Sequence, residues 1–398
     1  MIKGFKVRLF PTKEQEILMW KHVGCSRYIY NYMLDLQKTR YEFREELGLE
    51  KPFLSAFDMN REITSLKADS EHEWLKEIGI HTLQIACKDL SEAYKSFFKK
   101  NNGYPKFKSR KRSKPNFPVS SDKSMLYFID DEFIKLPKIG KVSYHVKYKV
   151  FPIEFGRNKI TLYNPRISFI NNKWILSFGL EVERKDQRPK SDKSIGIDLG
   201  IKELATVAFG YEDSYVFHNI NKSKRVRNLE RKKKHLQRVL SRKWRQNGHN
   251  NESSNYIKVK RELEVVQQKL NNIRNNYIHQ ITHQLISLNP HTIVMEDLNV
   301  SGMMKNKHLA KSISEANFYE FIRQMKYKCE WNNINFIQVD RYYPSSKTCS
   351  CCGSVKSDLK LKDRVYICPE CGLEIDRDYN AALNLMKYGS YCISELSA

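Results

Sequence analysis

The chain has 398 residues and a formal net charge of +25, because 70 Lys and Arg outnumber 45 Asp and Glu. Its length predicts two or three compact units, each with its own core. The charge predicts a polyanionic partner, and the aromatic content of 12% favours base stacking over contact with a lipid surface. The charged first residues and the absence of a long apolar run exclude a signal peptide and a membrane-spanning helix, so we expect a cytoplasmic protein.

The first hundred residues are predicted to be mostly helical. Residues 2–10 alternate apolar and basic side chains, which is typical of a half-buried strand, and Thr12 to Gln15 form a capping box that opens a helix through about Val23. Apolar side chains at helical spacing predict a second helix from Ile29 to Leu36 and a third after Gly79.

A basic and aromatic segment follows the predicted helices. It runs from Lys99 to Phe117 and contains the candidate nucleic-acid ligands Lys106, Lys108, Arg110, Lys111 and Arg112. Strands are expected near residues 133–136, 141–146 and 174–183, and with the N-terminal strand they could form one β-barrel. The polar stretch 186–193 is the predicted boundary between domains.

The second half has the pattern of a different domain. Three strands near residues 195–200, 204–208 and 215–217 predict an antiparallel meander. Two long charged helices follow, at about 222–244 and 255–288, and a strand over 292–295 ends at Glu296. This order is typical of an RNase H-like sheet with a helical insertion, so the predicted fold class is α+β with several domains.

Three acidic residues are placed where they can meet at one edge of that sheet. Asp198 lies inside an apolar strand, Glu296 ends another strand, and Asp378 precedes an apolar helix. Several carboxylates are needed to hold two divalent ions for phosphodiester hydrolysis, and oxygen ligands select Mg²⁺ or Mn²⁺. Glu296 could instead simply close its strand, and Asp376 or Asp378 could be a helix N-cap. A purely structural role is less plausible for Asp198, because an unpaired carboxylate inside an apolar strand would cost stability.

A second constellation consists of cysteines. Two Cys-x2-Cys pairs, each followed by glycine, predict one structural zinc site with four thiolates at Cys349, Cys352, Cys368 and Cys371. Cys351 offers a competing register with Cys349, but a spacing of one residue fits a zinc knuckle poorly. We therefore interpret Cys351 as a free thiol.

Four segments together resemble the TnpB family of transposon-encoded, RNA-guided nucleases, which are related to type V CRISPR effectors. They are Gly196-Ile197-Asp198-Leu199-Gly200-Ile201-Lys202, Glu296-Asp297-Leu298-Asn299, Tyr343-Pro344-Ser345-Ser346-Lys347-Thr348-Cys349 and Asp376-Arg377-Asp378-Tyr379-Asn380-Ala381-Ala382. The start, Val7-Arg8-Leu9-Phe10-Pro11-Thr12, and the segment Gly103-Tyr104-Pro105-Lys106-Phe107 resemble it too. The resemblance therefore covers the whole length.

The resemblance implies a domain plan. A wedge β-barrel (1–11 and 100–188) carries an inserted helical recognition domain (12–99). A RuvC nuclease domain (189–344 and 374–398, helical insertion 221–288) carries an inserted zinc ribbon (345–373).

The resemblance also implies the partners and the activity. These are a guide RNA from the transposon end, a double-stranded DNA target, and cleavage beside a short adjacent motif, by a protein expected to be a monomer. Asp198, Glu296 and Asp378 would be catalytic, and Gln84 is either the side chain that contacts the adjacent motif or an ordinary polar surface residue. The chain departs from the family pattern at Cys351, and at Ile80 and His81 beside the recognition helix residue Gln84.

Three other functions remain open at this point. An RNA-guided repressor would bind without cutting, but the intact acids argue against it. A strand-joining transposase would fit an Asp, Asp, Glu order better. A zinc-ribbon nucleic-acid-binding protein with incidental acids would show no effect of magnesium beyond affinity. For the nuclease, we expect guide and target in a groove lined by residues 106–114, 222–245 and 258–274.

Overall fold

The computed structural model describes residues 1–110, 113–146, 154–183, 193–210, 213–246, 248, 253–360 and 363–396, with the side chains of 392–396 excepted. The chain divides into two compact units, Met1–Glu183 and Arg184–Ala398, and each is described by itself. The predicted boundary at 186–193 lies outside the described residues except for Lys193. Among the residues described, no helix is long and apolar enough to cross a membrane.

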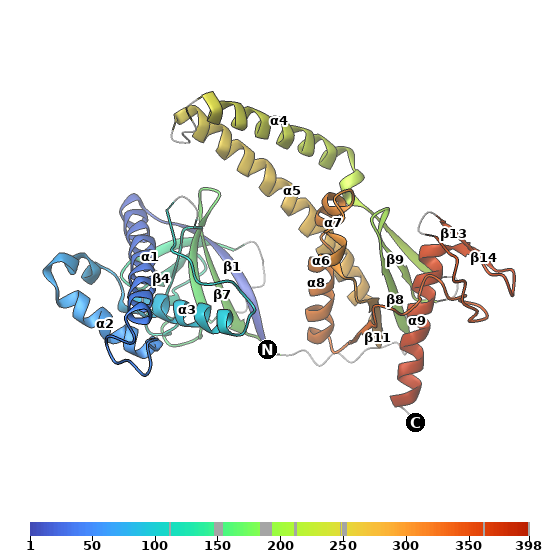
Figure 1. Ribbon diagram of the computed structural model, residues 1–398, viewed down its shortest axis with the longest axis horizontal. Coiled ribbons are helices and arrows are strands. Elements are labelled where there is room, and N and C mark those ends of the chain that lie inside the picture. Colours follow the sequence, from blue (N-terminus) through green and yellow to red (C-terminus); the bar gives the residue numbers. More distant parts are fainter. Residues whose placement is uncertain are drawn as a thin grey trace. The chain divides into compact units, whose positions relative to one another are not determined.

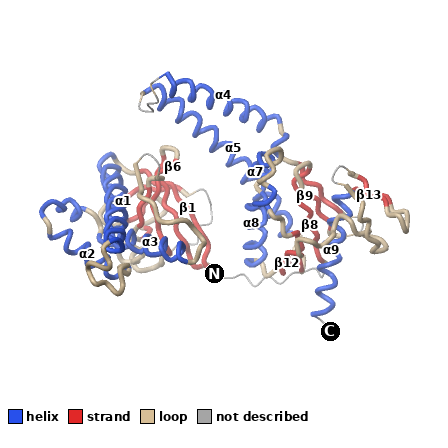
Figure 2. Tube along the Cα trace, viewed as in Figure 1, coloured by secondary structure: helices blue, strands red, loops and turns tan. Residues whose placement is uncertain are grey.

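The first unit combines a sheet with a helical layer (Figures 1 and 2). Its helices are α1 (Lys13–Glu42), α2 (Ala56–Ala68), the 3-10 helix η1 (Ser70–Glu77) and α3 (Ile80–Phe98). Its strands are β1 (Ile2–Phe10), β2 (Asn116–Pro118), β3 (Tyr127–Phe128), β4 (Phe133–Leu136), β5 (Gly140–His145), β6 (Tyr163–Ile170) and β7 (Lys173–Glu181).

All seven strands form one antiparallel sheet in the order β2-β6-β7-β1-β5-β4-β3. The N-terminal strand β1 is central, because it pairs with β7 on one side and β5 on the other. No pairing joins β2 to β3 among the residues described, so the closure of a barrel stays a prediction.

Helix α1 corrects the prediction of two separate helices between Thr12 and Leu36. The predicted capping box is confirmed, since Thr12 Oγ1 accepts from the Gln15 amide at 3.3 Å, but the helix then continues unbroken to Glu42. Met19 and Val23 pack into the core of the sheet, whereas Ile29 belongs to the core of the helical layer. One helix thus serves two cores, and the change of partners around Gly24 looks like an interruption in the sequence pattern.

The second unit has a five-stranded sheet in the order β10-β9-β8-β11-β12. The predicted meander is confirmed in β8 (Ser194–Leu199), β9 (Glu203–Ala208) and β10 (Ser214–His218), which pair antiparallel. Strands β11 (Thr292–Glu296) and β12 (Asn335–Val339) continue the sheet, with β11 parallel to both β8 and β12.

Helices cover both faces of this sheet. The helices of this unit are α4 (Lys224–Gln246), α5 (Ser254–Ser287), α6 (Val300–Met303), α7 (Ala310–Ala316), α8 (Phe318–Trp331) and α9 (Arg377–Leu396), with the 3-10 helix η2 (Ile220–Lys222). Helices α5 and α8 share a buried core with one face of the sheet. Helix α9 packs on the other face, against β8, β9 and β11 (Figure 1). The two long helices α4 and α5 pair through their own small apolar core, as predicted for the insertion.

A separate segment lies between β12 and α9. It carries the cysteine cluster and the two-stranded sheet of β13 (Val365–Ile367) and β14 (Glu374–Asp376). Because β14 leads directly into α9, the position of this segment is tied to the start of that helix.

Candidate functional site

The candidate acids on β8 and β11 project from the same face of the sheet. Met295 pairs with Ile197 in the parallel ladder. The next residue on each strand is an acid, so Glu296 and Asp198 lie side by side at the ends of neighbouring strands. Side chains alternate between faces along a strand. Ile197 and Met295 are buried in the core with α5 and α8, which leaves Asp198 and Glu296 on the α9 side.

Two glycine positions bring α9 close to that face. A Cβ on Gly196 would lie 2.0 Å from the carbonyl oxygen of Ala382 and 2.4 Å from the amide nitrogen of Met386. A Cβ on Gly389 would lie 2.7 Å from Val294 Cγ2. The helix backbone therefore rests directly on β8 and β11. Since Gly196 and Asp198 share a face, this contact brings the first turn of α9, which contains Asp378, toward Asp198.

Asp376, and not Asp378, caps helix α9. Asp376 Oδ1 accepts from the backbone amides of Asp378 and Tyr379, both at 3.0 Å. The interpretation of Asp378 as the N-cap is therefore wrong. Its carboxylate instead receives Arg377 Nη2 at 2.8 Å and lies 3.8 Å from Arg364 Nη1.

The electrostatics of the three acids indicate a site with excess negative charge, which Arg377 offsets only in part. Burial and the nearby charges of Glu296 and Asp378 raise the pKa of Asp198 well above its ordinary value. All three side chains are half-buried. Among the described residues, the cysteine sulfurs form a set within 4.8 Å of one another, whereas the oxygens of these three acids do not. A carboxylate set of this kind fits hard divalent cations, which would offset the mutual repulsion.

Glu296 has a partner that the sequence pattern did not reveal. The buried Ser345 donates a hydrogen bond from its Oγ to Glu296 Oε1. Ser345 lies in the segment 343–349 that follows β12 and leads to Cys349. The sequence motif contains this serine, but only the fold brings it to a strand end 49 residues earlier.

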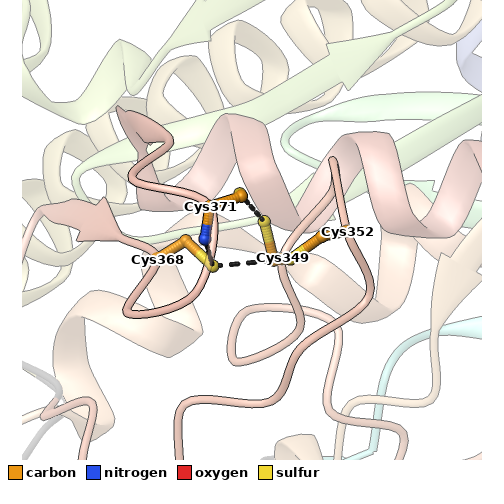
Figure 3. A group of neighbouring side chains, drawn as sticks. All are labelled: Cys349, Cys352, Cys368 and Cys371. Atoms are coloured by element: carbon orange, nitrogen blue, oxygen red, sulfur yellow. Dashed lines mark hydrogen bonds between the residues drawn. The ribbon is translucent and has the colours of Figure 1, made fainter.

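The four predicted cysteines come together in one cluster (Figure 3). The sulfurs of Cys349, Cys352, Cys368 and Cys371 all lie within 4.8 Å of one another. Two separations are 3.6 Å (Cys349 to Cys371) and 3.5 Å (Cys352 to Cys368), close to the ~3.8 Å edge of a tetrahedron with zinc–sulfur bonds of ~2.3 Å. The cluster could hold a structural zinc ion.

The competing register through Cys351 is excluded by this geometry. Cys351 is exposed and lies outside the set, and its backbone amide donates to Cys349 Sγ at 3.4 Å. The amides of Cys371 and Glu370 also lower the pKa of the Cys368 thiol to about 6. Such amide contacts favour thiolates, which are the form that binds a metal.

Two buried asparagines attach the cysteine segment to helix α9. Asn380 donates to the Thr348 carbonyl at 2.7 Å and accepts from the Ser350 amide at 2.9 Å. Asn384 donates to the carbonyls of Ser345 and Thr348, each at 2.7 Å. The helix that positions Asp378 thus also holds the loop that supplies Ser345 to Glu296.

The predicted nucleic-acid contacts lie in the first unit. Gln84 is partly exposed on α3 and lines a pocket of about 290 Å³ between α2 and α3. Lys106 and Arg110 are exposed, and Lys108 is half-buried. Lys111 and Arg112 lie outside the described residues, so nothing is added here to their predicted role.

Family models match three parts of the chain. They are described as "Helix-turn-helix domain" over residues 1–46, "Probable transposase" over 177–307 and "Cas12f1-like, TNB domain" over 318–385. In the first of these ranges the structure has β1 and the single helix α1.

Whole proteins are similar too. A "Putative RNA-guided DNA endonuclease" of Streptomyces pristinaespiralis is 30% identical over 97% of this chain and 89% of its own length. InsQ of Escherichia coli K12, which carries the same description, is 29% identical over 98% and 92%. A chain in a cryo-EM structure of a Cas12f1–sgRNA–target DNA complex shares the fold, with a TM-score of 0.60, 14% identity and coverage of 97% and 98%.

Proposed function

Because this chain belongs to the TnpB family of RNA-guided DNA endonucleases, we propose that it cuts double-stranded DNA beside a short adjacent motif, with a RuvC-type active site that requires divalent metal ions. The observation that carries this proposal is the meeting of β8, β11 and α9, which places three acids on one side of one sheet edge. A sheet in this order, with carboxylates at these ends, suits phosphodiester hydrolysis.

Each residue of the site has a role in the proposal. Asp198, Glu296 and Asp378 would hold two Mg²⁺ or Mn²⁺ ions, which supply water activation and stabilisation of the leaving oxygen when bound. Ser345 keeps the Glu296 carboxylate in one orientation through its hydrogen bond. Arg377 holds Asp378 and partly offsets the charge repulsion at Asp198.

The cysteine segment 345–373 is proposed as a zinc ribbon with a structural role. Four thiolates close the coordination sphere and leave no position for a substrate, which is typical of structural zinc. The hydrogen bonds from Asn380 and Asn384 transmit this order to the first turn of α9. Zinc would therefore support the site without taking part in the reaction.

The first unit is proposed to hold the wedge and recognition domains, with a guide RNA and target DNA as ligands. Support for Gln84 as a reader of the adjacent motif comes from its surroundings. It shares its pocket with Lys88, and with Lys95, which pairs with Glu92 of the same pocket at 2.8 Å. The amide of Gln84 beside Lys88 suits a base edge next to a phosphate.

The proposal is tested by purifying the protein from cells that also carry the DNA flanking its gene, and sequencing the RNA that copurifies. The recovered RNA is then reprogrammed to match a plasmid, and cleavage is assayed with magnesium and with EDTA. Guide-matched, magnesium-dependent cutting supports the proposal. Bound RNA without cutting would indicate a repressor, and the absence of bound RNA would return the strand-joining transposase to consideration.

A further inference from the structure

A cavity of about 740 Å³ lies in the first unit, between α1, α3 and residues 108–110 and 113–116 of the basic segment. Its volume is within the range of sites for small molecules or single nucleotides. The residues that the argument uses are Trp20, Gly24, Arg27, Asp89, Lys108 and Lys114, all of which contribute to its lining. The cavity belongs entirely to the first unit and is separate from the three acids.

The most informative lining residue is Lys108. Its Nζ lies 3.5 Å from the centre of the Tyr30 ring, and no carboxylate forms an ion pair with it in the part of the chain that is described. Burial lowers the pKa of this ammonium group. The charge of Asp89 offsets part of this effect. An anion in the adjoining cavity would stabilise this half-buried cation further.

The backbone of Lys108 is held firmly in place. Asn31 donates from Nδ2 to the Lys108 carbonyl and accepts from its amide at Oδ1, both at 2.8 Å. The two bonds attach the basic segment to α1 as a strand pair would. The backbone at Lys108 is therefore fixed relative to α1 before a ligand binds.

The other charges of the cavity also favour an anion. Arg27, Arg110 and Lys114 line it without an ion pair among the described residues. Asp89 is the acidic member of the lining, and Arg166 already neutralises it with a contact of 2.5 Å. The lining therefore has a net positive charge, which favours the binding of a phosphate group.

An aromatic surface stands at the same cavity. Trp20 makes edge contacts with Phe169 and Trp174, with ring centres 4.9 and 5.1 Å apart and interplanar angles of 61° and 67°. These contacts fix the indole, yet 40% of Trp20 remains exposed. An exposed, immobilised indole beside phosphate-binding cations suits the stacking of an unpaired base.

Gly24 gives an independent indication. It lies in the interior of α1, where glycine is less favourable than alanine. A Cβ at this position would meet no atom of the protein within 4 Å, so packing does not require the glycine. Gly24 lines this cavity and also a smaller pocket with Lys21 and Glu77. The absence of a close neighbour leaves room for a ligand on this part of α1.

We propose that this cavity binds one nucleotide of a single-stranded polynucleotide, with the phosphate at Lys108 and Arg27 and the base stacked on Trp20. The class of ligand rests on the proposed function, whereas the location of the site rests on the residues that line the cavity. Guide RNA and displaced or target DNA share this chemistry.

The test uses the full chain, freed of copurified RNA, and labelled oligo(U) and oligo(dT) strands of about 12 nucleotides. Affinity is measured by fluorescence anisotropy at one fixed salt concentration, and contacts are mapped by ultraviolet crosslinking and mass spectrometry. Lys108→Met is expected to weaken binding on the order of tenfold, whereas Lys173→Met, which removes an exposed charge of the same unit outside the cavity, should change it little. Trp20→Leu should weaken binding to a similar degree, and Trp20→Phe should restore most of it.

Gly24→Ala separates binding from folding, since it should raise the melting temperature while it weakens binding several-fold. If the cavity variants bind only oligo(U) more weakly, the site binds RNA; if they bind only oligo(dT) more weakly, it binds DNA. If they bind both strands more weakly, the site accepts either. Equal affinities of Lys108→Met and Lys173→Met, or a crosslink map without the Trp20 peptide, would overturn the inference. Asp198→Ala should bind both strands normally, so failure of this cavity and failure of the proposed nuclease are distinguishable.

Discussion

A Cβ atom on Gly196 would lie 2.0 Å from the carbonyl oxygen of Ala382, so β8 and α9 touch backbone to backbone at this point. Asp198 lies two residues beyond Gly196, and Asp378 lies one helical turn before Ala382. The distance between two acids that are far apart in the sequence is therefore set by a contact in which neither takes part.

Gly196→Ala is expected to push α9 away from the sheet. The clash involves backbone atoms, which cannot rotate aside, so the substitution should cost at least about 1–3 kcal/mol of stability. Thermal unfolding should show a lower melting temperature, and cleavage should fall even where the protein remains folded. Gly4→Ala is the control, because its added methyl group would meet nothing within 4 Å. A fully active Gly196→Ala protein would contradict this role.

Asp376 and Asp378 should separate stability from activity. Asp376→Ala removes the cap of α9 and should cost about 1 kcal/mol of stability, with cleavage retained below the melting temperature. Asp378→Ala should abolish cleavage with little loss of stability, because it removes a charge that repels Asp198. Thermal unfolding and plasmid cleavage of the two variants provide the comparison. Reversed effects would mean that the capping and metal-binding roles were exchanged.

Ser345→Ala tests the positioning of Glu296. Without the donated hydrogen bond, the carboxylate loses its fixed orientation, so the cleavage rate should fall about 10- to 100-fold and more Mg²⁺ should be needed for half-maximal rate. The exposed Ser301 offers a matched serine-to-alanine control. A lower rate with an unchanged magnesium requirement would argue against positioning of a metal ligand.

Removal of zinc should disable the nuclease indirectly. One zinc ion per chain is expected by metal analysis, and Cys368→Ser should lose it, loosen the segment held by Asn380 and Asn384, and lower cleavage. Cys351→Ser should retain zinc and activity, because Cys351 is exposed and outside the cluster. Loss of zinc from Cys351→Ser would restore the competing register.

The raised pKa of Asp198 predicts a pH effect in metal-free buffer. The folded protein keeps a proton on Asp198 that the unfolded chain has released, so stability falls as pH rises from the ordinary aspartate pKa through the raised value. Asp198→Asn should therefore raise the melting temperature at neutral pH in EDTA and flatten this dependence. Added Mg²⁺ should stabilise the natural protein and not the variant; equal stabilisation of both would place the ion elsewhere.

Local patterns were sufficient for much of the second unit. The meander, β11 and the paired long helices follow from alternation, helical spacing and polar interruptions, and the cysteine cluster follows from the spacing of its members. These features depend on neighbours in the chain, which is why they are readable from it.

Features that depend on distant contacts were missed. Strand β6 has its partners in β2 and β7, and α1 is continuous because two separate cores bury its two halves. The spacing of Asp376 and Asp378 could not decide which of the two caps α9. The hydrogen bond from Ser345 to Glu296 likewise requires the whole sheet to be in place.

The central claim is that Asp198 belongs to the active site of a guide-directed nuclease. The most direct measurement compares the natural protein with Asp198→Ala, each loaded with the same guide RNA, for binding and cleavage of a matched plasmid in magnesium. We predict that both bind the matched DNA and that only the natural protein cuts it. Cleavage by Asp198→Ala at the natural rate would contradict the account.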